Sequence, residues 1–187
     1  MSAKQLAVVD VETTSGDPLK GRIMEIAIVV ASHDRIIESW SSLVDPCTPV
    51  PGFIERLTGI SATLVADSPT FDQVLPRVEE LTRDRILVAH NIRYDLTVLK
   101  REFQRCGRPF ERASLCTEKL SRRLHPHLAH HNLTSLCRYY GIPYSGQHRA
   151  LNDASATHRL LVQMTESMVR NGGLPSEPGG PRSPMRA

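Results

Sequence analysis

The chain has 187 residues, of which 40% are hydrophobic and 23% charged, with a net charge of +3, and this balance is typical of one soluble globular domain. Its four cysteines are scattered without a C-x-x-C pair, which argues against a zinc ribbon or a redox motif and suits a reducing cytoplasm. No apolar run approaches the ~20 residues of a membrane span, and acids interrupt the short apolar run near the N-terminus, so we expect neither a signal peptide nor membrane contact.

The first part of the chain reads as three strands and two helical segments. Apolar runs predict buried strands over residues 6–11, 23–31 and 36–44. A polar link between the second and third runs suits a hairpin. After a Pro-rich loop, a short helical piece ends near Gly59, and apolar residues at helical spacing predict a helix over 71–83. Pro76 falls inside that helix and is a candidate for a kink.

The second part alternates strands and helices. Residues 86–89 and 112–116 read as short strands, with a helix over 93–106 between them. Three further helices are predicted over 117–124, 133–140 and 150–169. This order favours an α/β fold, a five-stranded mixed sheet flanked by helices. Gly, Pro and Ser dominate the C-terminus, so we expect one domain over 1–170 and a disordered tail over 171–187.

Two carboxylates stand near the end of the first predicted strand. Asp10 and Glu12 are two residues apart, a spacing that places both side chains on the same face of a strand. Their surroundings, LAVVDVET, are apolar, so two acids there are costly unless a positive group such as a bound cation compensates them. For this triplet alone, a strand end that faces solvent is the more ordinary explanation.

Three more candidates follow strand ends or helix starts. Asp95 in AHNIRYD falls in the first turn of a predicted helix, where a carboxylate also suits the helix dipole. His148 and Asp153 in HRALNDA lie just before and within the last helix, and Asp153 shares the side of its apolar stripe. Each has an ordinary reading, as a helix N-terminal acid or a loop histidine.

Together the candidates predict a metal site of the hydrolytic kind. A sheet gathers residues that follow its strand ends into one crevice, and carboxylate oxygens suit Mg²⁺ or Mn²⁺ better than zinc. Two such ions can activate a water and stabilise the leaving oxygen of a phosphodiester. A histidine that titrates near neutrality is a natural general base for that water.

These motifs resemble a known family. DVETT at Asp10–Thr14, AHNxxxD ending at Asp95 and HxAxxDA starting at His148 have the order and spacing of the DnaQ-like exonucleases, the DEDDh branch of the RNase H-like fold, which includes the proofreading epsilon subunit of bacterial DNA polymerase III. LTGI at Leu57–Ile60 is similar to a segment that, in bacterial members, packs beside the 3′-terminal nucleotide. The similarity spans about residues 5–168.

The resemblance implies two divalent metal ions, Mg²⁺ or Mn²⁺, and release of nucleoside monophosphates from a 3′ end. It implies that Asp10, Glu12 and Asp153 hold the more deeply bound ion. Asp10 then bridges to a second ion that Asp95 supports, and His148 is the general base. The residues implied to lie near the terminal nucleotide are Thr13, Thr14, Thr58, His90 and Asn91, with no chemical role assigned to His90.

Two features depart from the family, and three functions stay open. Ser15 stands before Gly16, where the family's first motif usually continues directly with Gly, and the tail shows no evident polymerase-binding segment. The first hypothesis is a 3′–5′ exonuclease on single-stranded or frayed DNA in proofreading or repair, with a DNA polymerase as a possible partner. The alternatives are an exoribonuclease that trims RNA 3′ ends and, in another class, a non-catalytic nucleic-acid-binding module.

The charges are unevenly distributed. Residues 1–99 hold 9 Lys/Arg against 14 Asp/Glu, whereas residues 100–150 hold 10 Lys/Arg against 3 Asp/Glu. Charge alone favours a solvated helix face, but with the motifs we interpret this basic segment as a surface for a nucleic-acid backbone.

A histidine-rich segment, HPHLAHH at His125–His131, invites a metal-site interpretation. Pro126 breaks its local regularity, and the segment carries no acid. We expect a structural or solvated loop there, with adventitious Zn²⁺ or Ni²⁺ binding or a nucleic-acid contact as the alternatives.

Overall fold

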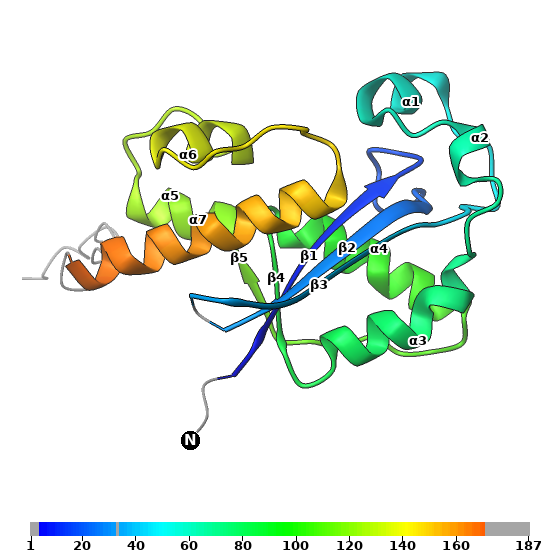
Figure 1. Ribbon diagram of the computed structural model, residues 1–187, viewed down its shortest axis with the longest axis horizontal. Helices are drawn as coiled ribbons and strands as arrows, with labels where there is room; N and C mark the ends of the chain where they lie inside the picture. The colour runs from blue at the N-terminus through cyan, green and yellow to red at the C-terminus, as the bar shows by residue number, and fades with distance from the viewer. Residues whose placement is uncertain (1–3, 33, 171–187) are drawn as a thin grey trace, which may run out of the picture.

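A five-stranded mixed sheet in the order β3-β2-β1-β4-β5 lies at the centre of the protein (Figure 1). The computed structural model describes residues 4–32 and 34–170, so the predicted tail at 171–187 lies outside the described residues. The strands are β1 (Leu6–Thr13), β2 (Ile23–Ala31), β3 (Ile36–Leu43), β4 (Ile86–Ala89) and β5 (Ser114–Cys116). β1 pairs antiparallel with β2 and parallel with β4, β2 and β3 form the predicted hairpin, and β5 adds to β4 in parallel.

Helices cover both faces of this sheet. Within the described residues they are α1 (Gly52–Thr58), α2 (Ala62–Val65), α3 (Phe71–Thr82), α4 (Ile92–Arg105), α5 (Thr117–Leu124), α6 (Leu133–Tyr139) and α7 (Ala150–Arg170). In Figure 1, α7 lies with α5 and α6 on one side of the sheet, α3 and α4 lie on the other, and α1 and α2 extend beyond the end of β1. None of the described helices has both the length and the apolarity that crossing a membrane requires.

Alternation along β1 divides its side chains between two cores. Val9 and Val11 pack with α3 and α4, whereas Val8 packs against Ala154 and Leu161 of α7. Because side chains two apart share a face, Asp10 and Glu12 point to the α7 side. β2 is buried along its whole length, as its apolar run, interrupted only by Glu25, predicts for a strand covered on both faces.

The predicted elements agree with the structure to within a few residues at their ends, and one helix was missed. α2 has four residues, too few for apolar periodicity to reveal, and its N-terminus is capped by Ser61, whose side chain accepts the backbone N–H of Leu64. Pro76 does not end α3. A proline has no N–H to donate to the carbonyl four residues earlier, that of Asp72, but both residues are exposed, so this carbonyl lies on the solvent side of the helix.

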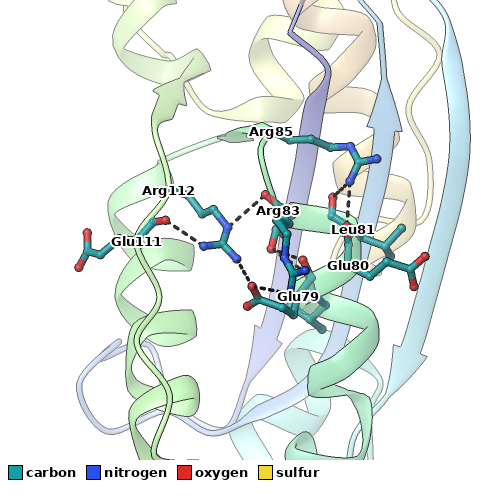
Figure 2. A network of polar contacts seen from close by, with 9 residues as sticks. Glu79, Glu80, Leu81, Arg83, Arg85, Glu111 and Arg112 are labelled. Carbon is teal, nitrogen blue, oxygen red and sulfur yellow. Dashed lines mark hydrogen bonds and ion pairs between the residues drawn. The ribbon is translucent and has the colours of Figure 1, made fainter.

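Arginines satisfy the carbonyl groups at the C-terminus of α3 (Figure 2). Arg85 Nη1 donates to the carbonyls of Glu80 and Leu81 at 2.9 and 3.1 Å, and Arg112 Nε donates to the carbonyl of Thr82 at 3.1 Å. Arg112 also pairs with the Glu79 carboxylate at 3.0 Å. A helix end leaves its last carbonyls without intrahelical partners, so these side chains replace the usual glycine cap and tie α3 to the segment before β5.

This network generates a stability prediction. Arg112→Met keeps a long apolar stem but leaves the carbonyl of Thr82 without its side-chain donor and the carboxylate of Glu79 with Arg83 alone, so we expect a loss of about 1–3 kcal/mol in the free energy of unfolding. Urea denaturation followed by circular dichroism measures this loss. Arg101→Met, at an exposed position of α4, is the matched control, and an equal effect of both substitutions would contradict the role assigned to Arg112.

Candidate active site

Three carboxylates from two distant segments meet at the C-terminal end of β1. Asp10 and Glu12 project from β1 toward α7, and Asp153 comes from the first turn of α7. One carboxylate oxygen from each lies within 4.8 Å of the other two. Among the described residues, this is the one group of at least three Asp, Glu, His or Cys side chains that is compact enough to share a metal ion.

Asp95 approaches the same place from the opposite layer of helices. It lies in the first turn of α4, directly after the end of β4, and is 4% exposed. Asn91 caps α4 in the left-handed conformation, with φ of 70°, a geometry that Asn tolerates better than most residues. Asp95 is outside the group of three but lines the same cavity, so the four predicted acids share one site.

The cavity has a volume of about 230 Å³ and collects most of the predicted site residues. The predicted residues that line it are Asp10, Glu12, Thr13, Thr58, His90, Asn91, Asp95, His148 and Asp153. Thr14 is not part of the lining, because its hydroxyl oxygen turns to accept the backbone N–H of Arg22 at 3.0 Å. Leu57 of the LTGI segment also lines the cavity, and Ile54 and Tyr94 add a part of the wall that the motifs did not predict.

The acids carry more negative charge than the surrounding protein can stabilise. Burial, and then the charges of Asp95 and Asp153, raise the pKa of Asp10 well above its ordinary value. Burial and the charge of Asp153 raise the pKa of Glu12 to about 8. Burial likewise raises the pKa of Asp95 to about 8, although hydrogen bonds from its own backbone N–H and that of Val11 oppose the shift.

This charge fits divalent cations. Crowded carboxylate oxygens are the ligands that Mg²⁺ and Mn²⁺ prefer, and a cation among them would reverse the direction of the pKa shifts. Asp10, Glu12 and Asp153 supply the compact donor set, and Asp95 supplies a fourth carboxylate to the same cavity.

Glu25 fixes the start of α7. It is 4% exposed and lies opposite Glu12 across the β1–β2 pair. Its carboxylate accepts the Arg149 guanidinium at 3.1 Å and the backbone N–H of Ala150 at 3.0 Å. These contacts hold Arg149 and Ala150, the two residues that follow His148. The backbone of His148 itself is left-handed, with φ of 60°. The signal in the sequence was a lone acid inside the apolar run of β2.

Tyr144 orients one of the metal-ligand candidates. Its hydroxyl donates to Asp153 Oδ1 at 2.8 Å, and this contact closes the segment that carries His148 back onto the first turn of α7. Burial and the hydrogen bond to Asp153 raise the pKa of Tyr144, so the hydroxyl keeps its proton to donate. No motif pointed to Tyr144, because it lies in an irregular loop.

The loop that carries Ser15 is held through its backbone. The backbone carbonyl of Ser15 accepts hydrogen bonds from the hydroxyl groups of Thr13, at 2.7 Å, and Tyr94, at 2.5 Å. Thr13 and Tyr94 both line the cavity, so the loop that follows β1 is fastened to α4 at the cavity wall.

The histidine-rich segment supports the cavity from behind. His90 makes two contacts, from Nδ1 to the Thr117 hydroxyl at 2.9 Å and from Nε2 to the carbonyl of His131 at 2.8 Å. His131 in turn contacts Ser121, and His125 contacts Tyr140, whereas His127 and His130 are exposed. Within the described residues these histidines form no compact metal group, and two of them are packing residues.

Comparison with known proteins gives a consistent result. A family model described as Exonuclease (RNase_T) matches residues 7–161. The chain is 34% identical over 162 residues to DNA polymerase III subunit epsilon of Aquifex aeolicus, a match that covers 86% of this chain and 80% of the relative. It is 35% identical over 170 residues to the 3′-5′ exonuclease DinG of Bacillus subtilis, covering 90% of this chain and 18% of the relative.

Other matches are to longer proteins and to solved structures. A DNA polymerase III of the PolC type from Caldanaerobacter subterraneus is 32% identical over 168 residues. The match covers 90% of this chain but only 12% of that much longer protein. Exonuclease X in complex with 5′ overhanging duplex DNA superposes with a TM-score of 0.71 and 29% identity, covering 87% of this chain and 92% of that one. The nuclease domain of 3′hExo bound to rAMP, at 22% identity over 89% of this chain and 94% of that one, shares the fold with a TM-score of 0.76.

The raised pKa of Asp95 predicts how stability depends on pH. Because its pKa is near 8 in the folded protein and near 4 in an unfolded chain, the metal-free protein should lose stability as pH rises from 5 to 8. Asp95→Asn removes this ionisation, so the variant should lose about 3–4 kcal/mol less over that range. Thermal unfolding in EDTA tests this, with exposed Asp67→Asn as control. A parallel pH dependence in wild type and Asp95→Asn would contradict the assignment.

The Tyr144 contact predicts a change in metal affinity. Tyr144→Phe removes only the hydroxyl that orients Asp153, and losing a partner of a ligand typically weakens metal binding about 10-fold or more. Calorimetric titration with Mn²⁺ measures this directly. Tyr139→Phe, on the half-exposed ring of α6, should bind as wild type, and unchanged affinity in Tyr144→Phe would show that the hydroxyl does not support the site.

Proposed function

The chain belongs to the Exonuclease (RNase_T) family and carries an exonuclease domain, and on that premise we propose that it removes nucleoside monophosphates from the 3′ end of single-stranded or frayed DNA. The expected resemblance to DnaQ-like exonucleases and the expected α/β, RNase H-like fold are confirmed. The observation that carries the proposal is the convergence of all four acids and His148 on one cavity.

The proposed roles follow from position. Asp10, Glu12 and Asp153 hold one divalent ion, and Asp10 with Asp95 holds a second. Two ions of the Mg²⁺ or Mn²⁺ type supply a more acidic water and charge stabilisation at the leaving oxygen. His148 accepts the proton of the attacking water. Its place between two anchored points, Tyr144 and Arg149, supports that role, because a general base must be held within hydrogen-bond reach of its proton.

The remaining cavity residues are proposed to hold the terminal nucleotide. Thr13 and Asn91 offer polar groups, and Thr58 stands on the LTGI segment. Thr58 donates to the carbonyl of Ile54 and accepts the N–H of Ile60, which fixes the turn around it. His90 is proposed as a positioning residue, since both ring nitrogens are engaged by the protein. Thr14 is proposed to act indirectly, through the loop that it closes onto Arg22.

The biological setting belongs to the same proposal. We infer a domain over residues 1–170 with a tail over 171–187, acting in the cytoplasm in proofreading or repair. The similarity to an epsilon subunit, of which the chain spans 80%, supports a DNA polymerase as partner. DNA is favoured over RNA because relatives at 29% identity or more include Exonuclease X solved with DNA and a polymerase subunit.

Matched oligonucleotides test the reaction. We expect wild type with Mg²⁺ or Mn²⁺ to shorten a 5′-labelled single-stranded DNA from its 3′ end faster than an RNA of the same sequence, and EDTA to stop it. Asp10→Ala and His148→Ala should each lower kcat by about 10²–10⁴-fold, since each removes a group that acts in the transition state. Asp67→Ala is the exposed control. Full activity in Asp10→Ala would refute the metal assignment, and faster digestion of RNA would favour the exoribonuclease alternative.

A further inference from the structure

A second cavity lies against α7, apart from the catalytic one. Its walls are formed by residues 34–36, which lead into β3, by residues 140–143 after α6 and by one side of α7, and we call it the α7 cavity. Its volume of about 570 Å³ lies within the ~300–1,000 Å³ of typical small-molecule sites. Among the described residues, none lines both this cavity and the catalytic one. The α7 cavity is therefore a separate place where a ligand can bind.

We propose that the α7 cavity binds a nucleoside monophosphate at a second site, separate from the active site. The inference goes beyond the proposed function, because no step of the hydrolysis takes place there. A nucleoside monophosphate combines a flat base with apolar faces, a sugar that carries hydroxyl groups, and a phosphate. It is also the class of product that the proposed reaction releases, so the protein would meet it at each turnover.

The apolar part of the lining suits the base. Ile142, Pro143 and Val162 contribute aliphatic side chains, and Tyr140 contributes an aromatic one. Ile36, which is 39% exposed, adds an apolar group from the start of β3. A base can lie against such a wall whatever its sequence identity, because every base has an apolar π-face.

Two arginines bring positive charge to the same cavity. Arg35 precedes β3 and Arg159 lies on α7, and both are exposed members of the lining. Within residues 4–32 and 34–170, neither forms an ion pair with a carboxylate. A guanidinium binds phosphate oxygens through parallel N–H donors, with both charge and geometry in its favour. The charge of the lining thus complements a phosphate.

Polar side chains match the remaining parts of the ligand. Asp34 is the one acid of the lining, so two guanidinium groups face a single carboxylate and the balance stays positive. Its carboxylate is an acceptor for hydroxyl groups, as its 3.3 Å contact with the Ser32 hydroxyl shows, and sugar hydroxyls can use it in the same way. The amide of Gln163 offers a donor and an acceptor to the edge of a base.

The walls of the α7 cavity are joined before any ligand binds. Buried His158 contacts the carbonyl of Ser32 through Nε2 at 3.4 Å, which links α7 to the β2–β3 hairpin. Arg159 Nη1 contacts the carbonyl of Pro143 at 3.4 Å, and this single long contact involves one of the five N–H donors of the guanidinium. A site held in shape in this way loses little conformational entropy on binding.

Calorimetric titration with deoxyadenosine 5′-monophosphate tests the site. The Asp10→Ala protein serves as parent, because losing a metal ligand weakens binding of the phosphate in the catalytic cavity. We expect the parent to bind one equivalent. Adding Arg159→Met should weaken binding about 10-fold or more, since it removes a charge-assisted donor, and Arg159→Lys should bind more tightly than Arg159→Met. Exposed Arg101→Met on α4 is the matched control and should bind as the parent does.

Separate titrations with adenosine and with inorganic phosphate test whether both parts of the ligand are recognised. We expect each to bind at least about 10-fold more weakly than the nucleotide. A parent with no Kd below about 1 mM for the nucleotide, or equal binding by Arg159→Met, would overturn the site. Inorganic phosphate that binds as tightly as the nucleotide would show an adventitious ion only, and equally tight adenosine would exclude phosphate recognition. A wild-type protein without hydrolytic activity would refute the proposed function and leave these comparisons valid.

Discussion

The burial of several carboxylates together at the end of β1 is the constraint on which the rest of this site depends. Asp10, Glu12, Asp95 and Asp153 occupy one cavity, and burial and neighbouring negative charge raise the pKa of each. Among the cationic side chains, Arg149 lowers the pKa of Glu12, but Glu25 already engages its guanidinium. The fold therefore holds together acids that take up protons in the absence of metal and that a cation of high charge density can stabilise in their ionised form.

Holding that set in place requires anchors, and the chain supplies them from distant segments. Glu25 of β2 fixes the residues before α7, Tyr144 fixes Asp153, and the carbonyl of His131 fixes His90. Each anchor restrains a residue that lies at the end of a helix or strand or in the loop beside it. The histidine-rich segment belongs to this supporting layer, because its packing residues hold up the back of the cavity rather than forming a second metal site.

The sequence predicted most of the fold and the acids for a common reason. Period-two alternation and strand-end position are local properties, so they revealed the shared face of Asp10 and Glu12 and the places of Asp95 and Asp153. The anchors were not predictable, because the partner of Glu25 lies 124 residues away and depends on tertiary structure. Thr14 shows the same limit: its motif position implied a substrate contact, whereas the loop after β1 turns its hydroxyl to Arg22.

The basic segment over residues 100–150 has less available charge than its composition suggests. Five of its cations pair with carboxylates, namely Lys100, Arg105, Arg112, Arg122 and Arg149. Arg122, which lines a hollow that shares His90 and Asn91 with the catalytic cavity, is held by Glu118 at 2.7 Å. The net charge of residues 100–150 is +7, from 10 Lys/Arg and 3 Asp/Glu, and it already includes the partners of Lys100, Arg105 and Arg122. Only the pairs of Arg112 with Glu79 and of Arg149 with Glu25 reduce it further, to +5, so the attraction of this segment for a nucleic-acid backbone is reduced but remains.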